Sequence, residues 1–486
     1  MDKYHLFVTT SILLADLAIR LLLSLRIIMR KKEARSTLAW LVLILLIPFV
    51  GAITYLILGE NRLGQKRAEH AASILPAFKN WVSSLEKRIS INKREINASC
   101  YPVELQALKV MGLPTLPGND LELIEGADKF FHALIKDIDQ AQSFCFLEFY
   151  IWKEGGLADE VAHAVIRAAS RGVTCQVLLD SIGSASFLTG ELVKKMRHSN
   201  VKVIECLPAG IFRALFVRVD LRNHRKIAII DRKVGYTGSQ NLVDPHFFKQ
   251  EENVGEWIDT MVRVNGPVVE AMTATFLFDW FVENDLNPDE LSGIKELTEV
   301  QPAGNSQVQL VPSGPGFVQE GIHDLLLTTI YTARKELILT TPYFVPDNTI
   351  LIALKSAAHR GVEVTIIVPE KNDSKLVQYA SRARYSELSR SGIKIKKFSE
   401  GLLHAKTVTV DNEYSLIGSV NLDMRSFWLN FELTLFVYDK DFTGKLRTLQ
   451  QKYMQRATLL DSDHFAKRRF FSRLKENCAL IVGPLL

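Results

Sequence analysis

The chain has 486 residues, enough for two or three domains that each bury a hydrophobic core. Its hydrophobic content of 47% suggests a globular protein with some membrane-embedded sequence, and its net charge of +5 is too mild to identify an anionic partner. The five cysteines form no Cys-x-x-Cys pair, so neither a disulfide framework nor a zinc site is indicated.

Two long apolar stretches occupy the first 60 residues. Residues 7–28 are mostly apolar but include Asp16 and Arg20, which share one helix face at i,i+4 and can pair there. Residues 38–58 form an uncharged run, about as long as a helix that crosses ~30 Å of hydrocarbon. A cleaved signal peptide fits poorly, because no small-residue cleavage site follows the first stretch. The pattern predicts a two-helix transmembrane hairpin over residues 1–60, and the basic residues on its two sides leave its orientation open.

The rest of the chain repeats itself. Residues 61–117 have a helical, polar pattern that predicts a connector, and the cluster Leu116-Pro-Gly-Asn-Asp120 is typical of a turn. Beyond it, Ala168-Ala-Ser-Arg-Gly-Val173 returns as Ala357-Ala-His-Arg-Gly-Val362. Strand patterns alternate with helical ones, which predicts α/β halves with a largely parallel core sheet. Pro and Gly near residues 302–315 separate a first half over 118–300 from a second half over 301–486.

A motif of individual residues also occurs once in each half. His224-Arg-Lys226 is followed by Asp231 and then by Gly238-Ser239-Gln-Asn241. His404-Ala-Lys406 is followed by Asp411 and by Gly418-Ser419-Val-Asn421 at identical intervals. A single short motif carries a risk of chance occurrence, but two copies that keep every interval do not.

The residue types of this motif suit phosphate chemistry. In a strand that starts at the histidine, each histidine shares a face with its lysine, while the aspartate points to the other face, where an ion pair or turn contact is expected. Two imidazoles, two ammonium groups and amide donors fit a tetrahedral oxyanion, with one histidine attacking phosphorus and the other protonating the leaving alkoxide. No cluster with metal-ligand spacing accompanies them, so no metal or cofactor is expected. The predicted catalytic motif is His224, Lys226, Asp231, His404, Lys406 and Asp411, and the predicted substrate-binding residues are Ser239, Asn241, Ser419 and Asn421.

Each neutral imidazole also needs a partner that holds its tautomer. Downstream strands offer Asp259 in the first half and Glu432 in the second, at comparable places in the two repeats. Either could instead be a surface acid. We take both as candidates for orienting the catalytic histidines.

With these residues the chain resembles the phospholipase D superfamily, which is marked by the paired His-x-Lys-x4-Asp motif, over residues 118–460. More narrowly, it resembles bacterial cardiolipin synthases of that type. The narrower resemblance rests on the N-terminal hairpin, on Asp220-Leu-Arg-Asn-His224 and on Pro342-Tyr-Phe-Val-Pro-Asp347.

The resemblance implies two halves packed about a pseudo-twofold axis around one shared active site, in a multi-pass protein of a bacterial cell membrane. It implies phosphatidyl transfer between two phosphatidylglycerol molecules, giving cardiolipin and glycerol through a covalent phosphatidyl-histidine without a metal. His224 would be the nucleophile and His404 the general acid and then base. The phosphate ligands would be Lys226, Lys406, Asn241 and Asn421.

Alternatives remain open. Attack by water would make the chain a phospholipase D-type hydrolase. The motif also fits a nuclease, but no extended basic tract for nucleic acid is evident and a membrane hairpin argues for a lipid substrate. An inactive membrane scaffold is a different class, disfavoured by retention of both motifs. The oligomeric state is not indicated, and the basic, aromatic residues 465–475 fit either a helix on an anionic membrane surface or a packing helix.

Overall fold

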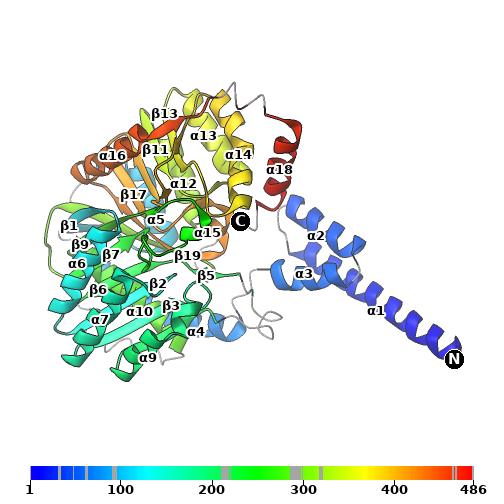
Figure 1. Ribbon diagram of the computed structural model, residues 1–486, viewed down its shortest axis with the longest axis horizontal. Coiled ribbons are helices and arrows are strands. Elements are labelled where there is room, and N and C mark those ends of the chain that lie inside the picture. Colours follow the sequence, from blue (N-terminus) through cyan, green and yellow to red (C-terminus); the bar gives the residue numbers. More distant parts are fainter. Residues whose placement is uncertain are drawn as a thin grey trace. The chain divides into compact units, whose positions relative to one another are not determined.

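A computed structural model describes residues 2–30, 34–47, 49–60, 64–89, 96–208, 218, 220–284, 297, 299–316, 321–461, 465 and 468–483. The chain forms two compact units (Figure 1). One comprises residues 1–68 and 209–221, and the other comprises residues 69–208 and 222–486. The two units are described separately.

The N-terminal unit contains three helices, α1 (Asp2–Met29), α2 (Ala34–Leu46) and α3 (Val50–Leu58). The prediction of a single helix over residues 38–58 is wrong. The helix is interrupted between Leu46 and Val50, where Phe49 adopts a positive φ of 51°. The expected pair of Asp16 and Arg20 does form, with a 2.5 Å separation, and Asp16 also accepts a hydrogen bond from the backbone N–H of Phe49. The buried carboxylate therefore ties α1 to the break.

The surface of this unit is strongly apolar. Ile27, Ile44 and Tyr55 form its small core, while most other large apolar side chains of α1 point outward, with Phe7 71% and Leu22 67% exposed. Among the described residues, no helix combines the length and the hydropathy needed to cross a bilayer.

The larger unit is built on one 16-stranded sheet. Fifteen strands run in the order β20-β14-β13-β11-β16-β17-β19-β10-β1-β9-β7-β6-β2-β3-β4, and the sixteenth, β5 (Arg222–Asn223), pairs with β19 off this path. Read outward from the β10–β1 junction, corresponding strands of the two repeats follow in the same order, with β20 as an extra edge strand. Since β1 and β10 pair antiparallel, the two halves are related by a pseudo-twofold axis at this junction.

The first half supplies β1 (Leu116–Glu125), β2 (Phe144–Phe149), β3 (Thr174–Asp180), β4 (Lys202–Cys206), β6 (Lys226–Ile230), β7 (Val234–Gly238) and β9 (Thr260–Asn265). The second half supplies β10 (Ser306–Ser313), β11 (Glu336–Thr340), β13 (Glu363–Pro369), β14 (Lys394–Phe398), β16 (Thr407–Val410), β17 (Tyr414–Gly418), β19 (Asn430–Val437) and β20 (Ala457–Leu459).

The expectation of a largely parallel sheet is wrong, because the sheet is mixed. Parallel pairing is confined to β2–β3–β4, β11–β13–β14 and the two-residue pairing of β5 with β19. The motif strands instead form antiparallel hairpins, β6–β7 and β16–β17. Their tight turns place Asp231 and Arg232, and Asp411 and Asn412, at positive φ, the backbone geometry that joins antiparallel rather than parallel strands.

Helices cover both faces of each half. On the first half, α6 (Ala127–Gln140), α7 (Leu157–Ser170) and α9 (Glu191–His198) cover one face, and α10 (Val268–Asn284) stacks Phe276 on Phe146 of β2. The second half uses α12 (Gly321–Thr332), α13 (Asn348–His359), α14 (Lys375–Arg390) and α16 (Lys440–Gln455). In Figure 1 the helices α6, α7 and α9 and the helices α13 and α14 lie at opposite ends of this unit.

The predicted connector and turn are both part of the packed unit. Helix α5 (Tyr101–Met111) contributes Val103 and Ala107 to the core of the second half, and α4 (Gln65–Ile89) donates a hydrogen bond from Trp81 to Glu270 of α10. The cluster at residues 116–120 is not a turn but the start of β1. Its register against β10 shifts between Leu116 and Asn119, where Gly118 has a φ of 90°, so a bulge accommodates the glycine.

Candidate active site

The two histidines lie just before the strands predicted to begin with them. Strand β6 begins at Lys226 and β16 at Thr407, so His224 and His404 occupy the short approach to each strand. Both side chains are buried, with exposed fractions of 6% and 2%. Their rings are therefore held by the surrounding protein.

Each approach pairs with the opposite half. Strand β5 (Arg222–Asn223) runs parallel to β19, and His224 N–H donates to Phe431 O at 2.8 Å. Strand β15 (Leu402–Leu403) runs parallel to β8 (Trp257–Ile258), and His404 N–H donates to Ile258 O at 2.8 Å. Both histidines are thus anchored where the halves meet, in one shared site.

The orienting carboxylates cross over in the same way. His224 Nδ1 lies 2.8 Å from Glu432 Oε2, and His404 Nδ1 lies 2.7 Å from Asp259 Oδ1. An ionised carboxylate only accepts hydrogen bonds, so each Nδ1 carries the proton and donates, and each Nε2 keeps its lone pair. Sequence spacing identified both acids, but it did not reveal that each serves the histidine of the other half.

Burial sets the protonation of this site. Desolvation lowers the pKa of His224 and of His404 to about 4, so both imidazoles are neutral near pH 7. Burial opposes ionisation of the acids, but the adjacent histidines and lysines outweigh it and lower the pKa of both Glu432 and Asp259. The pairs are therefore an ionised carboxylate and a neutral imidazole in the absence of substrate.

The two lysines are equally enclosed. Lys226 Nζ donates to His224 O at 2.6 Å and Lys406 Nζ to His404 O at 2.5 Å. Desolvation lowers the pKa of Lys226 to about 7 and that of Lys406 to about 8, and each lysine also lowers the pKa of the opposite histidine. This mutual influence places all four groups in one electrostatic site, with cations that a phosphate anion would stabilise.

The predicted substrate-binding residues divide into two kinds. Ser419 Oγ donates to Glu432 Oε2 at 2.5 Å, and Ser239 Oγ accepts from Thr260 N–H at 3.0 Å, so both hydroxyls act inside the protein rather than on substrate. Asn241 accepts from Ile151 N–H through Oδ1, which leaves its amide nitrogen as a donor. Asn421 Oδ1 is buried without a hydrogen-bond partner in the described part of the chain, and it can accept from a substrate hydroxyl.

The motif aspartates bind backbone groups at the start of a neighbouring strand. Asp231 accepts from the backbone N–H groups of residues 142–144, and Asp411 accepts from those of residues 334–336. These contacts tie the hairpin turn to the start of β2 or β11. They agree with the strand parity, which predicted a structural contact on the other face.

Aromatic side chains flank both histidines. Tyr150 lies 5.0 Å from the His224 ring, while Trp257 and Tyr343 lie 4.3 and 6.2 Å from that of His404. The sequence motif singles out none of these three aromatic residues as part of the site. Tyr150 and Tyr343 each follow an equivalent apolar strand, β2 or β11, and this shared place was the available signal.

An interaction between the halves adds to the His404 side. Tyr343 Oη donates to Asp373 Oδ1 at 3.0 Å, and Lys249 Nζ lies 2.9 Å from Asp373 Oδ2. Lys249 also stands over the Trp257 ring, 5.4 Å from its centroid. No motif marks this triad in the sequence, because its members come from three separate loops.

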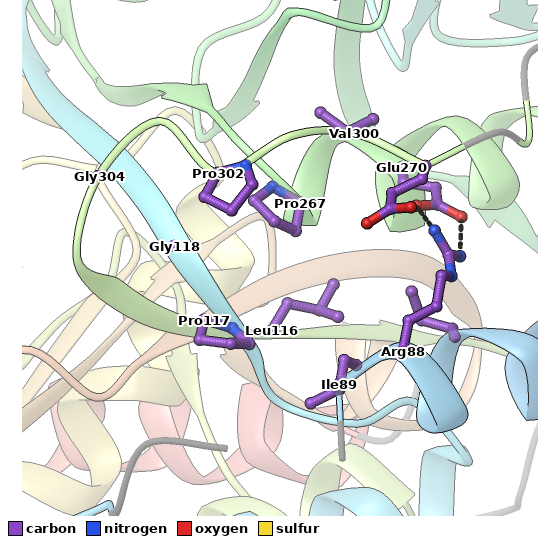
Figure 2. Close-up of a pocket in the computed structure, with 12 residues that line it drawn as sticks. Arg88, Ile89, Leu116, Pro117, Gly118, Pro267, Glu270, Val300, Pro302 and Gly304 are labelled. Carbon is purple, nitrogen blue, oxygen red and sulfur yellow. Dashed lines mark hydrogen bonds and ion pairs between the residues drawn. The ribbon is translucent and has the colours of Figure 1, made fainter. Parts of the chain in front are cut away.

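A cavity of about 300 Å³ lies elsewhere in the unit, between α4, β1 and the segment before β10. Figure 2 shows Arg88 reaching across it to Glu270, and none of the motif residues lines it. Among the described residues, no group of three or more His, Cys, Asp or Glu side chains is arranged to hold a metal ion.

Comparison with known proteins agrees with this geometry. Residues 134–280 and 326–454 match the family "Cardiolipin synthase, PLD-like domain", and residues 18–60 match "Phospholipase_D-nuclease N-terminal". The chain is 43% identical to cardiolipin synthase A of Edwardsiella ictaluri and of Yersinia pestis, over 95% of each chain. The chain belongs to the cardiolipin synthase family.

The fold has relatives among solved structures. The present structure superimposes on that of phosphatidylserine synthase from Haemophilus influenzae with a TM-score of 0.59. The two sequences are 15% identical, and the match covers 79% of this chain and 100% of the other. At this identity the likeness concerns the fold. It supports the assignment of a mixed α/β architecture with two phospholipase D-like halves.

Proposed function

We propose that this enzyme makes cardiolipin and glycerol from two phosphatidylglycerol molecules. The observation that carries the proposal is the crossed pairing of His224 with Glu432 and of His404 with Asp259. It gives one buried site two neutral imidazoles with lone pairs on Nε2, flanked by two lysines. A transfer that forms and then breaks a phosphorus–nitrogen bond needs these groups.

In the first half-reaction, His224 Nε2 attacks the phosphorus of one phosphatidylglycerol. The bond from phosphorus to the headgroup glycerol oxygen breaks, and His404 Nε2 gives its proton to that oxygen. His404 takes up this proton from solvent when substrate binds, because the negative charge of the phosphodiester raises the pKa of His404 and favours the imidazolium. Lys226 and Lys406 stabilise the charge that builds on the phosphoryl oxygens.

In the second half-reaction, a headgroup hydroxyl of another phosphatidylglycerol replaces the released glycerol. His404 takes its proton while the oxygen attacks the phosphatidyl-His224 intermediate, and the phosphorus–nitrogen bond breaks. Asn241 and Asn421 complete the phosphate and hydroxyl contacts. The second half-reaction is the reverse of the first with a different alcohol. The pseudo-twofold arrangement of the site suits both.

The N-terminal unit would hold the enzyme as a multi-pass protein in a bacterial cell membrane. The uncharged sequence over residues 38–58, the outward apolar side chains of α1 and the internal Asp16–Arg20 pair support this placement. Buried charges with exposed apolar residues suit a lipid surrounding better than water. Phosphatidylglycerol is then available from the same bilayer.

The test is to incubate detergent-purified protein with radiolabelled phosphatidylglycerol and EDTA, beside His224→Ala. Cardiolipin and free glycerol from the parent protein alone are expected. Phosphatidic acid as the sole product would establish hydrolysis by the same intermediate instead. Lack of product from both proteins would contradict the proposal and favour the inactive scaffold.

A further inference from the structure

The last helix, α18 (Phe470–Ile481), turns its apolar side chains away from the protein. Phe471 is 73%, Leu474 46% and Ile481 78% exposed, and Cys478 is also exposed. These positions follow one another at intervals of three, four and three residues, so they form one stripe along a single helix face. Phe470, beside the stripe, is 71% exposed.

The opposite face of α18 fixes this orientation. Glu476 is 2% exposed, and it pairs with Arg382 of α14 at 3.2 Å and with Arg468. Ala479 packs in a cluster with Val345 and with residues of α14. A helix on a soluble domain normally buries its large apolar face and exposes its acids, whereas α18 does the reverse. The contacts of Glu476 and Ala479 therefore keep the apolar stripe facing outward.

The charge on the exposed side has one sign. Arg469, Arg473 and Lys475 are exposed. The sequence after residue 464 has a single acidic residue, Glu476, and it lies on the buried face of the helix. Apolar side chains flanked by cations fit an anionic phospholipid surface, where the rings enter the acyl boundary and the cations meet phosphate groups. Two copies of this face would instead bring like charges together.

The helix also adjoins the active site within the same unit. The cluster that holds Ala479 continues to Tyr343, whose ring lies beside His404 and whose hydroxyl binds Asp373. Asp373 directly precedes Ser374, the N-cap of α14, which is the helix that carries α18. A surface that binds the stripe is thus one packing layer from the His404 side of the site.

We propose that the stripe Phe471–Leu474–Cys478–Ile481 of α18, with its flanking arginines and lysine, docks on the anionic phospholipid surface and holds the His404 side of the active site against it. This inference rests on the proposed function for its lipid substrate. It adds a second membrane contact, independent of the N-terminal unit.

Cys478 allows a direct test, because Cys100, Cys145, Cys175 and Cys206 are buried. Full-length His224→Ala protein, which cannot consume lipid, is labelled at Cys478 with an NBD fluorophore and placed in nanodiscs. We expect a blue-shifted, several-fold brighter emission in discs that contain phosphatidylglycerol than in pure phosphatidylcholine discs. Changing Arg469, Arg473 and Lys475 to Gln should abolish the difference. The matched control carries the label on α13, where Ile352 is 57% exposed. It combines Ile352→Cys with Cys478→Ser, so that only the control position is labelled.

Equal emission in both lipids and in detergent would overturn the inference. So would an equal blue shift in both kinds of disc that persists after Arg469, Arg473 and Lys475 are changed to Gln, because the anionic surface would then not be what the stripe binds. A separate measurement uses Phe471→Ser with an active site intact. Cardiolipin formation from vesicles should fall about tenfold while turnover of monomeric short-chain phosphatidylglycerol is unchanged, and Ile352→Ser should alter neither. If the parent protein formed no cardiolipin, the proposed function would be refuted. The NBD fluorescence result on membrane docking would still hold.

Discussion

The surroundings of His224 and His404 differ although their motifs are identical in spacing. Both rings lie beside a lysine bound to the histidine carbonyl, and burial lowers the pKa of both to about 4. Glu432, however, also accepts from Ser419, Ser426 and Asn430, whereas the His404 side has the Lys249–Asp373–Tyr343 triad. The shared features are those that both proposed half-reactions need, and the differences lie beside the two histidines to which we assign different roles.

The largest expected effects separate nucleophile from acid. His224→Ala and His404→Ala should each lower cardiolipin synthesis at least about 10³-fold, since one removes the attacking group and the other the proton donor. A phosphatidyl p-nitrophenyl ester needs no proton on its leaving group. With this probe, His404→Ala should still release one equivalent of p-nitrophenol in a burst, and His224→Ala should release none. The opposite pattern would make His404 the nucleophile.

Replacing the carboxylates should separate catalysis from stability. Asp259→Asn and Glu432→Gln should each lower kcat by about 10²- to 10⁴-fold, because the imidazole loses the partner that sets its tautomer. Glu432→Gln should also lower the free energy of unfolding by about 1–3 kcal/mol, since a neutral amide cannot accept from all of the donors around Glu432. Thermal unfolding beside turnover checks this. Equal destabilisation by both variants would contradict the described difference.

The lysines should behave alike. Lys226→Met and Lys406→Met each remove one buried cation from the phosphoryl group, and we expect a loss of about 10²-fold in kcat/KM. Steady-state kinetics on mixed micelles measures it. A loss confined to one variant would show that a single half binds the phosphate.

The pH dependence follows from the lowered pKa values. The nucleophile His224 must be neutral, so kcat/KM should fall below about pH 4, and the lysines must be charged, so it should fall again as pH rises through about 7 to 8. Bound phosphate raises the lysine pKa, which should move the alkaline limb of kcat to higher pH. Burial raises the pKa of Asp423 to about 7, so Asp423→Asn is the control, and an alkaline limb that disappears with it would assign that limb to the carboxyl group.

The smallest expected effect concerns the triad. Tyr343→Phe removes one hydrogen bond to Asp373, worth about 1 kcal/mol, and should lower activity about fivefold. Tyr331→Phe, on the exposed side of α12, is the matched control. An unchanged rate in Tyr343→Phe would show that the triad only joins the halves.

Sequence alone identified the duplicated motif, the two candidate acids and the structural place of Asp231 and Asp411, because these depend on spacing along one strand and on its alternation. It also indicated α/β halves, since helix and strand periodicities are local. The direction of strand pairing was missed, because it depends on the tight turns that begin at Asp231 and Asp411, whose positive φ values are not visible in a hydrophobic pattern.

Tertiary structure decided which acid serves which histidine. Glu432 and Asp259 reach across the pseudo-twofold axis because β5 joins β19 and β15 joins β8, and contacts between residues 208 and 145 positions apart leave no periodicity in the chain. The same holds for Lys249 and Asp373, and for the face that α18 exposes. A helical pattern shows that Phe471, Leu474 and Ile481 share a stripe, but only packing against α14 determines that the stripe points outward.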